Sequence, residues 1–216
     1  MKIKKIISRL LRLHPKSIDL SLHRIQRLLK SLNNPEKKIQ NCIQVVGTNG
    51  KFSICSTLRE IYETAGYKVN MHISPSVRKF NERYYFSGKQ ISDERLYNLL
   101  SEVEKVNKGQ PITFHEIITA AFFLEAARTN AHLNILEAGL FFRLDASNVL
   151  DKNIASIISP IGMDHKDFLK DGTIDEIIYE KCSKLLNNSK IIVSEQTSLD
   201  ILNKINEIIR PNSSKK

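Results

Sequence analysis

The fold of this chain is decided by the stretch Ile43-Gln44-Val45-Val46-Gly47-Thr48-Asn49-Gly50-Lys51-Phe52-Ser53. Its apolar start predicts a short buried strand, and the glycine-bounded turn leads into a helical pattern that runs to Ala65. A strand, a glycine turn and a helix start together form a phosphate-binding loop. Turn amides and the helix N-terminus attract anions, and a lysine reaches the outer phosphates.

This stretch differs from the standard P-loop pattern at two positions. Val45 stands where the first glycine belongs, and Ser53 follows Lys51 by two positions rather than one. The stretch therefore predicts a nucleotide site, and an ordinary glycine-containing turn between a strand and a helix is the alternative.

Composition limits the class of protein. The 216 residues suit one large domain or part of a two-domain protein, and no apolar run is long enough to cross a membrane. The net charge of +10 is compatible with nucleic-acid binding, but the basic residues are dispersed, so a polyanionic small molecule is the favoured ligand. Three scattered cysteines and a basic N-terminus without a secretory signal favour a cytoplasmic protein.

Short apolar segments alternate with helical patterns along the chain. Helices are expected at residues 18–32, 92–106, 113–128 and 174–186, strands at 67–73, 132–137, 154–158 and 191–194, and a hairpin at 80–91. This alternation predicts an α/β fold, with a mostly parallel sheet covered by helices on both faces. We expect one domain over residues 1–210 and a disordered tail over residues 211–216.

Polar residues follow the carboxyl ends of several expected strands, where ligands bind in parallel sheets. They are the 47–53 loop, Ser74, Glu137 and the pair Asp164-His165. A carboxylate at a strand end can hold Mg²⁺ that ATP phosphates also bind. The alternatives are a solvated glutamate at Glu137, a backbone-bonded loop histidine at His165, a surface lysine at Lys181 and a turn cap at Ser74.

Several further motifs follow one another in an informative order. They are Ile18-Asp19-Leu20-Ser21-Leu22-His23-Arg24-Ile25, Val46 to Ser53, Ser74-Pro75 with Phe80-Asn81-Glu82-Arg83, Thr113-Phe114-His115-Glu116 with Thr119-Ala120, Glu137-Ala138-Gly139-Leu140 with Arg143-Leu144-Asp145-Ala146-Ser147-Asn148, Ile161-Gly162-Met163-Asp164-His165, and Glu180-Lys181. Over residues 14–194 this set resembles the folylpolyglutamate synthase/dihydrofolate synthase family, relatives of the Mur ligases. The helix start at Thr113 resembles the family's Thr-x-Phe-Glu.

The resemblance implies a P-loop NTPase-like domain of the Mur ligase central-domain type and an ATP-dependent amide ligase. A folate or dihydropteroate carboxylate would be phosphorylated to an acyl phosphate, which the amine of L-glutamate then attacks. ATP and Mg²⁺ are the implied cofactors. The implied ATP-binding residues are Gly47, Thr48, Asn49, Gly50, Lys51 and Ser53, and the implied metal ligands are Ser74, Glu137 and His165. The implied catalytic residues are Lys181, which matches the family's carbamylated lysine, and His165. Phe114 and neighbouring residues would lie near the pterin.

The chain departs from the family pattern at several positions. Phe52 replaces a glycine inside the phosphate loop, Phe141-Phe142 replaces Gly-Gly, Ser76 replaces a histidine, and Cys182-Ser183 replaces Ala-Gly. Family members also carry a C-terminal domain that closes over the site. An impaired nucleotide- or folate-binding remnant, or a partial subunit that needs a partner chain, is therefore the alternative. A generic P-loop kinase or NTPase fits the Glu137 and Lys181 motifs less well.

Two hypotheses concern these phenylalanines. Phe141 and Phe142 could form an apolar surface that a second protein or a second copy covers. The ring of Phe52 could narrow the phosphate loop, where glycine allows close backbone approach.

If the Phe52 ring obstructs the loop, Phe52→Gly should tighten ATP binding severalfold, because the phosphates would then reach the loop amides. Isothermal titration calorimetry of both proteins measures this change. Equal affinities would contradict the steric hypothesis.

Overall fold

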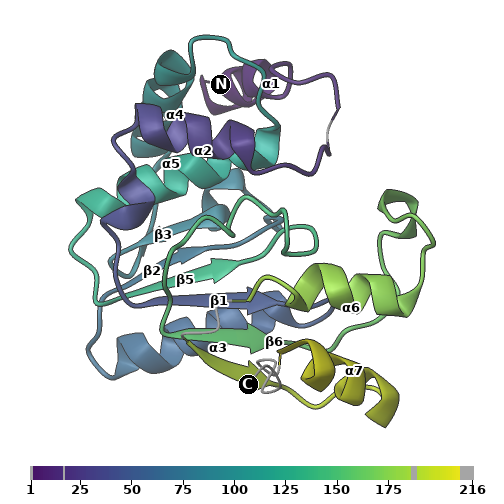
Figure 1. The fold of residues 1–216 in the computed structure, drawn as a ribbon. Coiled ribbons are helices and arrows are strands. Elements are labelled where there is room, and N and C mark those ends of the chain that lie inside the picture. Colours follow the sequence, from purple (N-terminus) through teal and green to yellow (C-terminus); the bar gives the residue numbers. More distant parts are fainter. Residues whose placement is uncertain (1, 17, 186–188, 210–216) are drawn as a thin grey trace.

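A single mixed sheet organises the molecule, for which the computed structural model describes residues 2–16, 18–185 and 189–209. Within these residues the strand order is β4-β3-β2-β5-β1-β6-β7 (Figure 1). The five neighbouring strands β2, β5, β1, β6 and β7 are parallel to one another, and β3 and β4 form an antiparallel hairpin at the edge. The predicted mostly parallel sheet is therefore confirmed. The strands are β1 Cys42–Val46, β2 Val69–His72, β3 Tyr84–Phe86, β4 Lys89–Gln90, β5 Leu133–Glu137, β6 Ala155–Ile158 and β7 Lys190–Val193.

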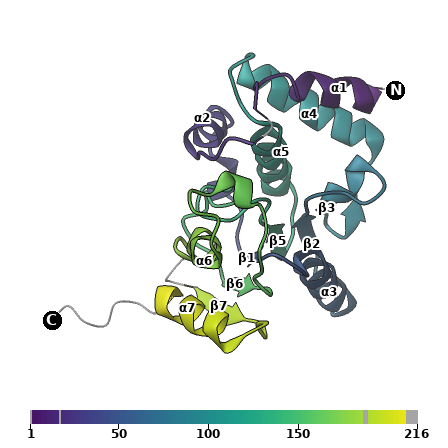
Figure 2. The ribbon, with the colours of Figure 1, turned by 90° about the vertical axis from the view of Figure 1, so that its right-hand side faces the viewer.

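Helices cover both faces of the sheet. Alternate side chains of β1 point to opposite sides, and apolar side chains on each side pack against helices. Val45 packs with Cys55 of α3 in one apolar cluster, whereas Val46 packs with Ile177 of α6 in another. Figure 2 looks along the sheet and separates α3 from the layer that holds α2, α4 and α5. The helices are α1 Lys2–Leu10, α2 His23–Ser31, α3 Lys51–Thr64, α4 Asp93–Asn107, α5 Phe114–Arg128, α6 Ile174–Cys182 and α7 Leu199–Ile209; the short 3-10 helices are η1 Pro35–Lys37, η2 Phe80–Arg83 and η3 Lys166–Phe168.

Helix α5 is apolar around most of its circumference, since it lies between the sheet and the helices α2 and α4. Its start is fixed by a capping box. The Thr113 hydroxyl accepts from the Glu116 amide, and the Glu116 carboxylate accepts from the Thr113 amide at 2.7 Å. This cap sets which side chains of the first turn point toward the sheet edge.

Two expected helix boundaries differ from the structure, and one helix was not predicted. Helix α2 begins at His23 rather than at residue 18, because the Asp19 carboxylate accepts from Arg24 instead of capping helix amides. Helix α6 ends at Cys182, earlier than predicted. Helix α7 was not predicted, although Ile201, Ile205 and Ile208 have helical spacing and pack in the core. Residue 186 and the predicted disordered tail lie outside the described residues.

The hypothesis that Phe141 and Phe142 form a bare partner surface is wrong. Their exposed fractions are 2% and 0%, and both rings pack in the cluster that joins the sheet to α6. Phe141 adopts a left-handed backbone with φ of +57°, a conformation that favours glycine. The rings of Phe141 and Phe142 are therefore part of the hydrophobic core and not of the surface.

No helix in the described part of the chain is long and apolar enough to cross a membrane.

Truncation of Phe142 should destabilise the domain strongly. We expect Phe142→Ala to lower the free energy of unfolding by about 3–5 kcal/mol, since it empties a fully buried ring site. Leu199→Ala, at a side chain that is 76% exposed, is the matched control and should change little. Urea unfolding followed by circular dichroism measures both, and equal effects of the two substitutions would contradict the packing described.

Candidate functional site

The predicted phosphate loop connects β1 to α3 through Gly47 and Gly50. Gly47 has φ of +135°, and a Cβ atom there would collide with the Ser159 hydroxyl and lie 2.7 Å from the Ser159 carbonyl oxygen. Gly50 is the N-cap of α3 with φ of +81°, and no side chain caps this helix. Both glycines are therefore required by backbone geometry, and the start of α3 is left open to a ligand.

The loop is tied to the segment after β6. The amides of Thr48 and Asn49 both donate to the Pro160 carbonyl, at 3.0 and 3.2 Å, and the Thr48 hydroxyl hydrogen-bonds to Gly162. These two amides are consequently engaged within the protein. The first helical amides, from Lys51 to Ser53, have no acceptor within the helix, so they are the amides that an anion can bind.

Two lysines from different helices converge on this loop. The Lys51 ammonium donates to the carbonyls of Gly47 and Thr48, at 3.1 Å each, and the Lys181 ammonium donates to the Gly47 carbonyl at 2.8 Å. Burial, together with the nearby charge of Lys51, lowers the pKa of Lys181 to about 8. Two ammonium groups that repel each other beside an open helix start match the charge of a polyphosphate.

A buried carboxylate lies at the end of β5. Glu137 is 4% exposed, and its carboxylate accepts from the Ser74 amide at 3.0 Å. Burial raises the pKa of Glu137, against the lowering effects of the Ser74 hydrogen bond and of Lys51 and Arg83. The Ser74 hydroxyl accepts from Arg83 at 3.1 Å. Ser74 and Glu137 are thus adjacent, with oxygen atoms of the kind that Mg²⁺ prefers.

The described contacts of His165 are with other residues. It has a left-handed backbone, its Nε2 lies 3.3 Å from the Asp164 carboxylate, and its ring lies against the Phe141 ring. The same Phe141 ring lies 5.6 Å from the Lys181 ammonium. In the described residues no hydrogen bond or ion pair joins His165 to Glu137, and no cluster of three or more His, Cys, Asp or Glu side chains could hold a metal.

A cavity of about 210 Å³ opens beside Ser74 and the loop after β5. Phe114, the residue expected near the pterin, does not line it, because its ring packs against Phe80. The next residue, His115, lines the cavity instead. The lining residues are Ile18, Asp19, Leu20, Ser21, Ser74, Thr113, His115, Glu116, Gly139, Leu140, Leu144, Asp145 and Ala146.

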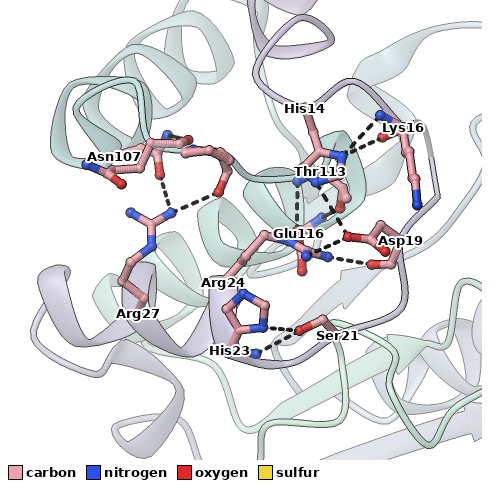
Figure 3. A network of polar contacts seen from close by, with 12 residues as sticks. His14, Lys16, Asp19, Ser21, His23, Arg24, Arg27, Asn107, Thr113 and Glu116 are labelled. Atoms are coloured by element: carbon pink, nitrogen blue, oxygen red, sulfur yellow. Dashed lines mark hydrogen bonds and ion pairs between the residues drawn. The ribbon is translucent and has the colours of Figure 1, made fainter.

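One wall of this cavity is the segment of residues 18–21 before α2. Arg24 holds it in place by donating to the Asp19 carboxylate at 2.7 Å and to the Glu116 carboxylate of α5 at 2.9 Å (Figure 3). The Arg24 side chain is buried, so this ion pair is shielded from solvent. The opening segment therefore serves as part of the cavity and not as the first turn of a helix.

Phe52 lies on another side of α3. Its side chain is half exposed and lines a hollow together with Arg59 and Tyr85, and no other residue of the 47–53 loop lines that hollow. This arrangement gives no support to the hypothesis that the Phe52 ring fills the phosphate loop.

Sequence reasoning missed three residues at this edge of the sheet. Arg83 is half-buried beside Ser74, and its buried Nε has no hydrogen-bond partner in the part of the chain that the structure describes. His115 and Asp145 both line the cavity, where Nε2 of the partly exposed His115 lies 3.0 Å from the buried Asp145 carboxylate. The motifs that contain them were visible in the sequence, but the direction of the His115 side chain depends on the start of α5 at the Thr113 cap, and the positions of Arg83 and Asp145 depend on tertiary contacts with Ser74 and His115.

The comparisons with known proteins agree with this geometry. No family model matches the chain. The dihydrofolate synthase/folylpolyglutamate synthase of Bacillus subtilis is 35% identical over 191 residues, which are 84% of this chain and 44% of the relative. That of Haemophilus influenzae is 33% identical over 196 residues, 89% of this chain and 44% of the relative.

Two solved structures show the same fold. Escherichia coli FolC in complex with DHPP and ADP has a TM-score of 0.84 at 30% identity, over 95% of this chain and 49% of that one. The bifunctional folylpolyglutamate synthase/dihydrofolate synthase of Yersinia pestis, complexed with AMPPNP and a Mn ion, has a TM-score of 0.83 at 26% identity, over 96% and 50%.

The parallel sheet and the loop between β1 and α3 define an α/β domain of the P-loop type found in Mur ligases. Within that class, the chain is related to the dihydrofolate synthase/folylpolyglutamate synthase family. It spans about half the length of the relatives that it matches.

The lowered pKa of Lys181 makes stability depend on pH. Between about pH 8 and the ordinary lysine value of 10.5, the native chain has released this proton and the unfolded chain has kept it, so this group adds stability as pH rises. From about pH 7.5 to 9.5 we expect the wild type to gain about 2 kcal/mol relative to Lys181→Met in denaturant unfolding. Parallel pH profiles of the two proteins would contradict the buried, charge-repelled environment of Lys181.

Proposed function

We propose that this chain is the ATP-binding part of an ATP-dependent ligase that joins L-glutamate to a folate or dihydropteroate through an acyl phosphate. The observation that supports it most directly is the convergence of Lys51 and Lys181 on the Gly47 carbonyl beside the open start of α3. The relatives of the chain are named for this activity, and the solved neighbours are complexes with ADP or AMPPNP.

The roles of the loop residues follow from their chemistry. Lys51 would bind the outer phosphates of ATP, together with the amides from Lys51 to Ser53 at the start of α3. Gly47, Thr48 and Asn49 would shape the loop by their contacts with the segment after β6, rather than by donating amides to phosphate. Catalysis would come mainly from positioning and charge neutralisation.

The metal would be Mg²⁺. Glu137 and Ser74 fit it, because Mg²⁺ is usually held by one or two protein oxygens together with substrate phosphates and water. His165 is the third proposed ligand, and it would have to approach from its present place beside Phe141. When bound, the ion would neutralise charge on the transferred phosphoryl group.

Lys181 would act through its free amine. The lowered pKa leaves a share of unprotonated Nζ near neutral pH, which can form an N–C bond with carbon dioxide and release a proton, giving a carbamate. The proposed carbamate would help to position the metal. The cavity beside Ser74 would take the ring system of the folate, with Phe114 behind its wall rather than in contact.

A completing protein chain or a second copy belongs to the same proposal, since the relatives are about twice as long as the matched region. We also propose that the described chain acts as a single ATP-binding domain. The alternative function is a nucleotide- or folate-binding protein without ligase activity, to which the Phe141 substitution in the glutamate loop would contribute.

The test combines binding and turnover. Lys51→Ala should weaken ATP binding about 10–100-fold, because it removes a charge-assisted hydrogen bond to phosphate. Lys89→Ala, at an exposed lysine of β4, is the matched control and should bind normally. Calorimetry measures ATP binding, and equal affinity of Lys51→Ala and wild type would contradict the proposed nucleotide site.

Turnover is measured with ATP, Mg²⁺, glutamate and either tetrahydrofolate or dihydropteroate, with mass spectrometry to detect the glutamylated product and ADP. Product that is lost in Lys51→Ala supports the ligase. ATP binding without product favours the binding-only alternative or the need for a completing chain.

A further inference from the structure

The starts of the five parallel strands lie along one edge of the sheet, opposite the edge that carries the phosphate loop (Figure 1). The segments at these strand starts carry exposed lysines, and the β3–β4 hairpin adds one more beside the start of β2. The fold thus gathers side chains that are dispersed in the sequence. This lysine edge consists of Lys37, Lys38, Lys68, Lys89, Lys152 and Lys190.

Backbone contacts join the segments that carry these lysines. The His132 amide donates to the Lys68 carbonyl at 2.8 Å, and the Asn41 side chain donates to the His132 carbonyl at 3.0 Å. The Ile154 amide donates to the first residue of β1 at 2.9 Å, and the Lys190 amide donates to the Ile154 carbonyl at 3.4 Å. Neighbouring strands are about 4.8 Å apart, so the edge is about 19 Å wide from β2 to β7. The lysines therefore belong to one surface.

Little of this charge is neutralised within the described part of the chain. Lys37 lies 3.6 Å from Asp151, but both side chains are mostly exposed, so this ion pair is weak. The other five lysines form no ion pair with a described residue. Glu36 is 7% exposed, and Glu63, near the β3–β4 turn, pairs with Arg59 at 3.5 Å. A ligand with a series of negative charges would gain from this surface.

Aromatic rings stand among the lysines. The Tyr67 side chain is 50% exposed, and its ring lies edge-to-face against the rings of Tyr62 and His132, with centroids 5.7 Å apart in each pair. His132 is fixed in turn, because its Nδ1 accepts from the Lys68 amide at 2.8 Å. An exposed ring that is held in place favours nucleic acid among the polyanions, since unpaired bases stack on aromatic rings.

We propose that the lysine edge is a binding surface for single-stranded nucleic acid, in which the lysines contact phosphates and Tyr67 stacks on an unpaired base. Single-strand binding proteins combine these two features, with site sizes of about 4–16 nucleotides. Phosphate contacts and ring stacking tolerate any sequence, so we expect little base preference. This binding is a further activity of the chain, and it is independent of the proposed ATP site at the opposite edge.

The experiment measures the fluorescence anisotropy of a labelled deoxythymidine oligomer of about 16 nucleotides as the full chain is added. A plot of the logarithm of the association constant against the logarithm of the salt concentration should have a slope of about −4, which corresponds to about 0.7 for each of six phosphate contacts. Neither saturating ADP nor Lys51→Ala should change the affinity, because the phosphate loop lies at the other edge of the sheet.

Lysine variants test the location of the surface. The double variant Lys68→Ala/Lys152→Ala should weaken binding about tenfold or more and make the salt slope less steep by about 1.4. Lys4→Ala/Lys5→Ala removes the same charge from exposed positions of α1, a helix that contacts α4 through Arg9 and Glu104. This matched control should bind like the wild type.

Tyrosine variants test the recognition of bases. Tyr67→Ala should weaken binding about 5–100-fold, the effect of one lost base–aromatic stack. Tyr67→Phe keeps the ring face and should bind like the wild type.

Four results would overturn the proposal. Absence of oligomer binding at low salt excludes the activity, and equal losses in Lys68→Ala/Lys152→Ala and in the α1 control exclude the lysine edge. Competition by ADP together with lost binding in Lys51→Ala places the oligomer at the phosphate loop. Full binding by Tyr67→Ala leaves a surface for any polyanion, without recognition of bases.

Discussion

The close approach of the Gly47 turn to Ser159 is the constraint on which the candidate site depends. Because Gly47 has no side chain, the turn can press against the end of β6, where Pro160 accepts the amides of Thr48 and Asn49. The same turn directs its carbonyl groups toward Lys51 and Lys181. The turn at Gly47 therefore makes contacts with the end of β6, with Lys51 of α3 and with Lys181 of α6.

Charge is unevenly balanced at this edge of the sheet. Among the described residues, the ammonium groups of Lys51 and Lys181 donate hydrogen bonds to backbone carbonyls and to no carboxylate, and the buried Nε of Arg83 has no hydrogen-bond partner there. Glu137 is the buried carboxylate among them, and its pKa is raised chiefly by burial. Cationic groups that lack a carboxylate partner cost stability when they are partly or fully buried, and this arrangement is expected where a polyanion supplies the missing partners.

The sequence was informative where local chemistry decides the structure. The glycine turn and the alternation of apolar segments predict the phosphate loop and the parallel sheet without tertiary information. The start of α2 could not be predicted in this way, because it depends on a buried contact between Asp19 and the distant α5 through Arg24. The inward packing of Phe141 similarly depends on α6, which approaches from a later part of the chain.

Arg24 contacts both the segment that forms one wall of the cavity and the first turn of the helix that presents His115. The segment of residues 18–21 and the first turn of α5 are consequently joined to each other through Arg24. The spacing of these two walls is therefore set by one guanidinium, which is not itself among the residues that line the cavity.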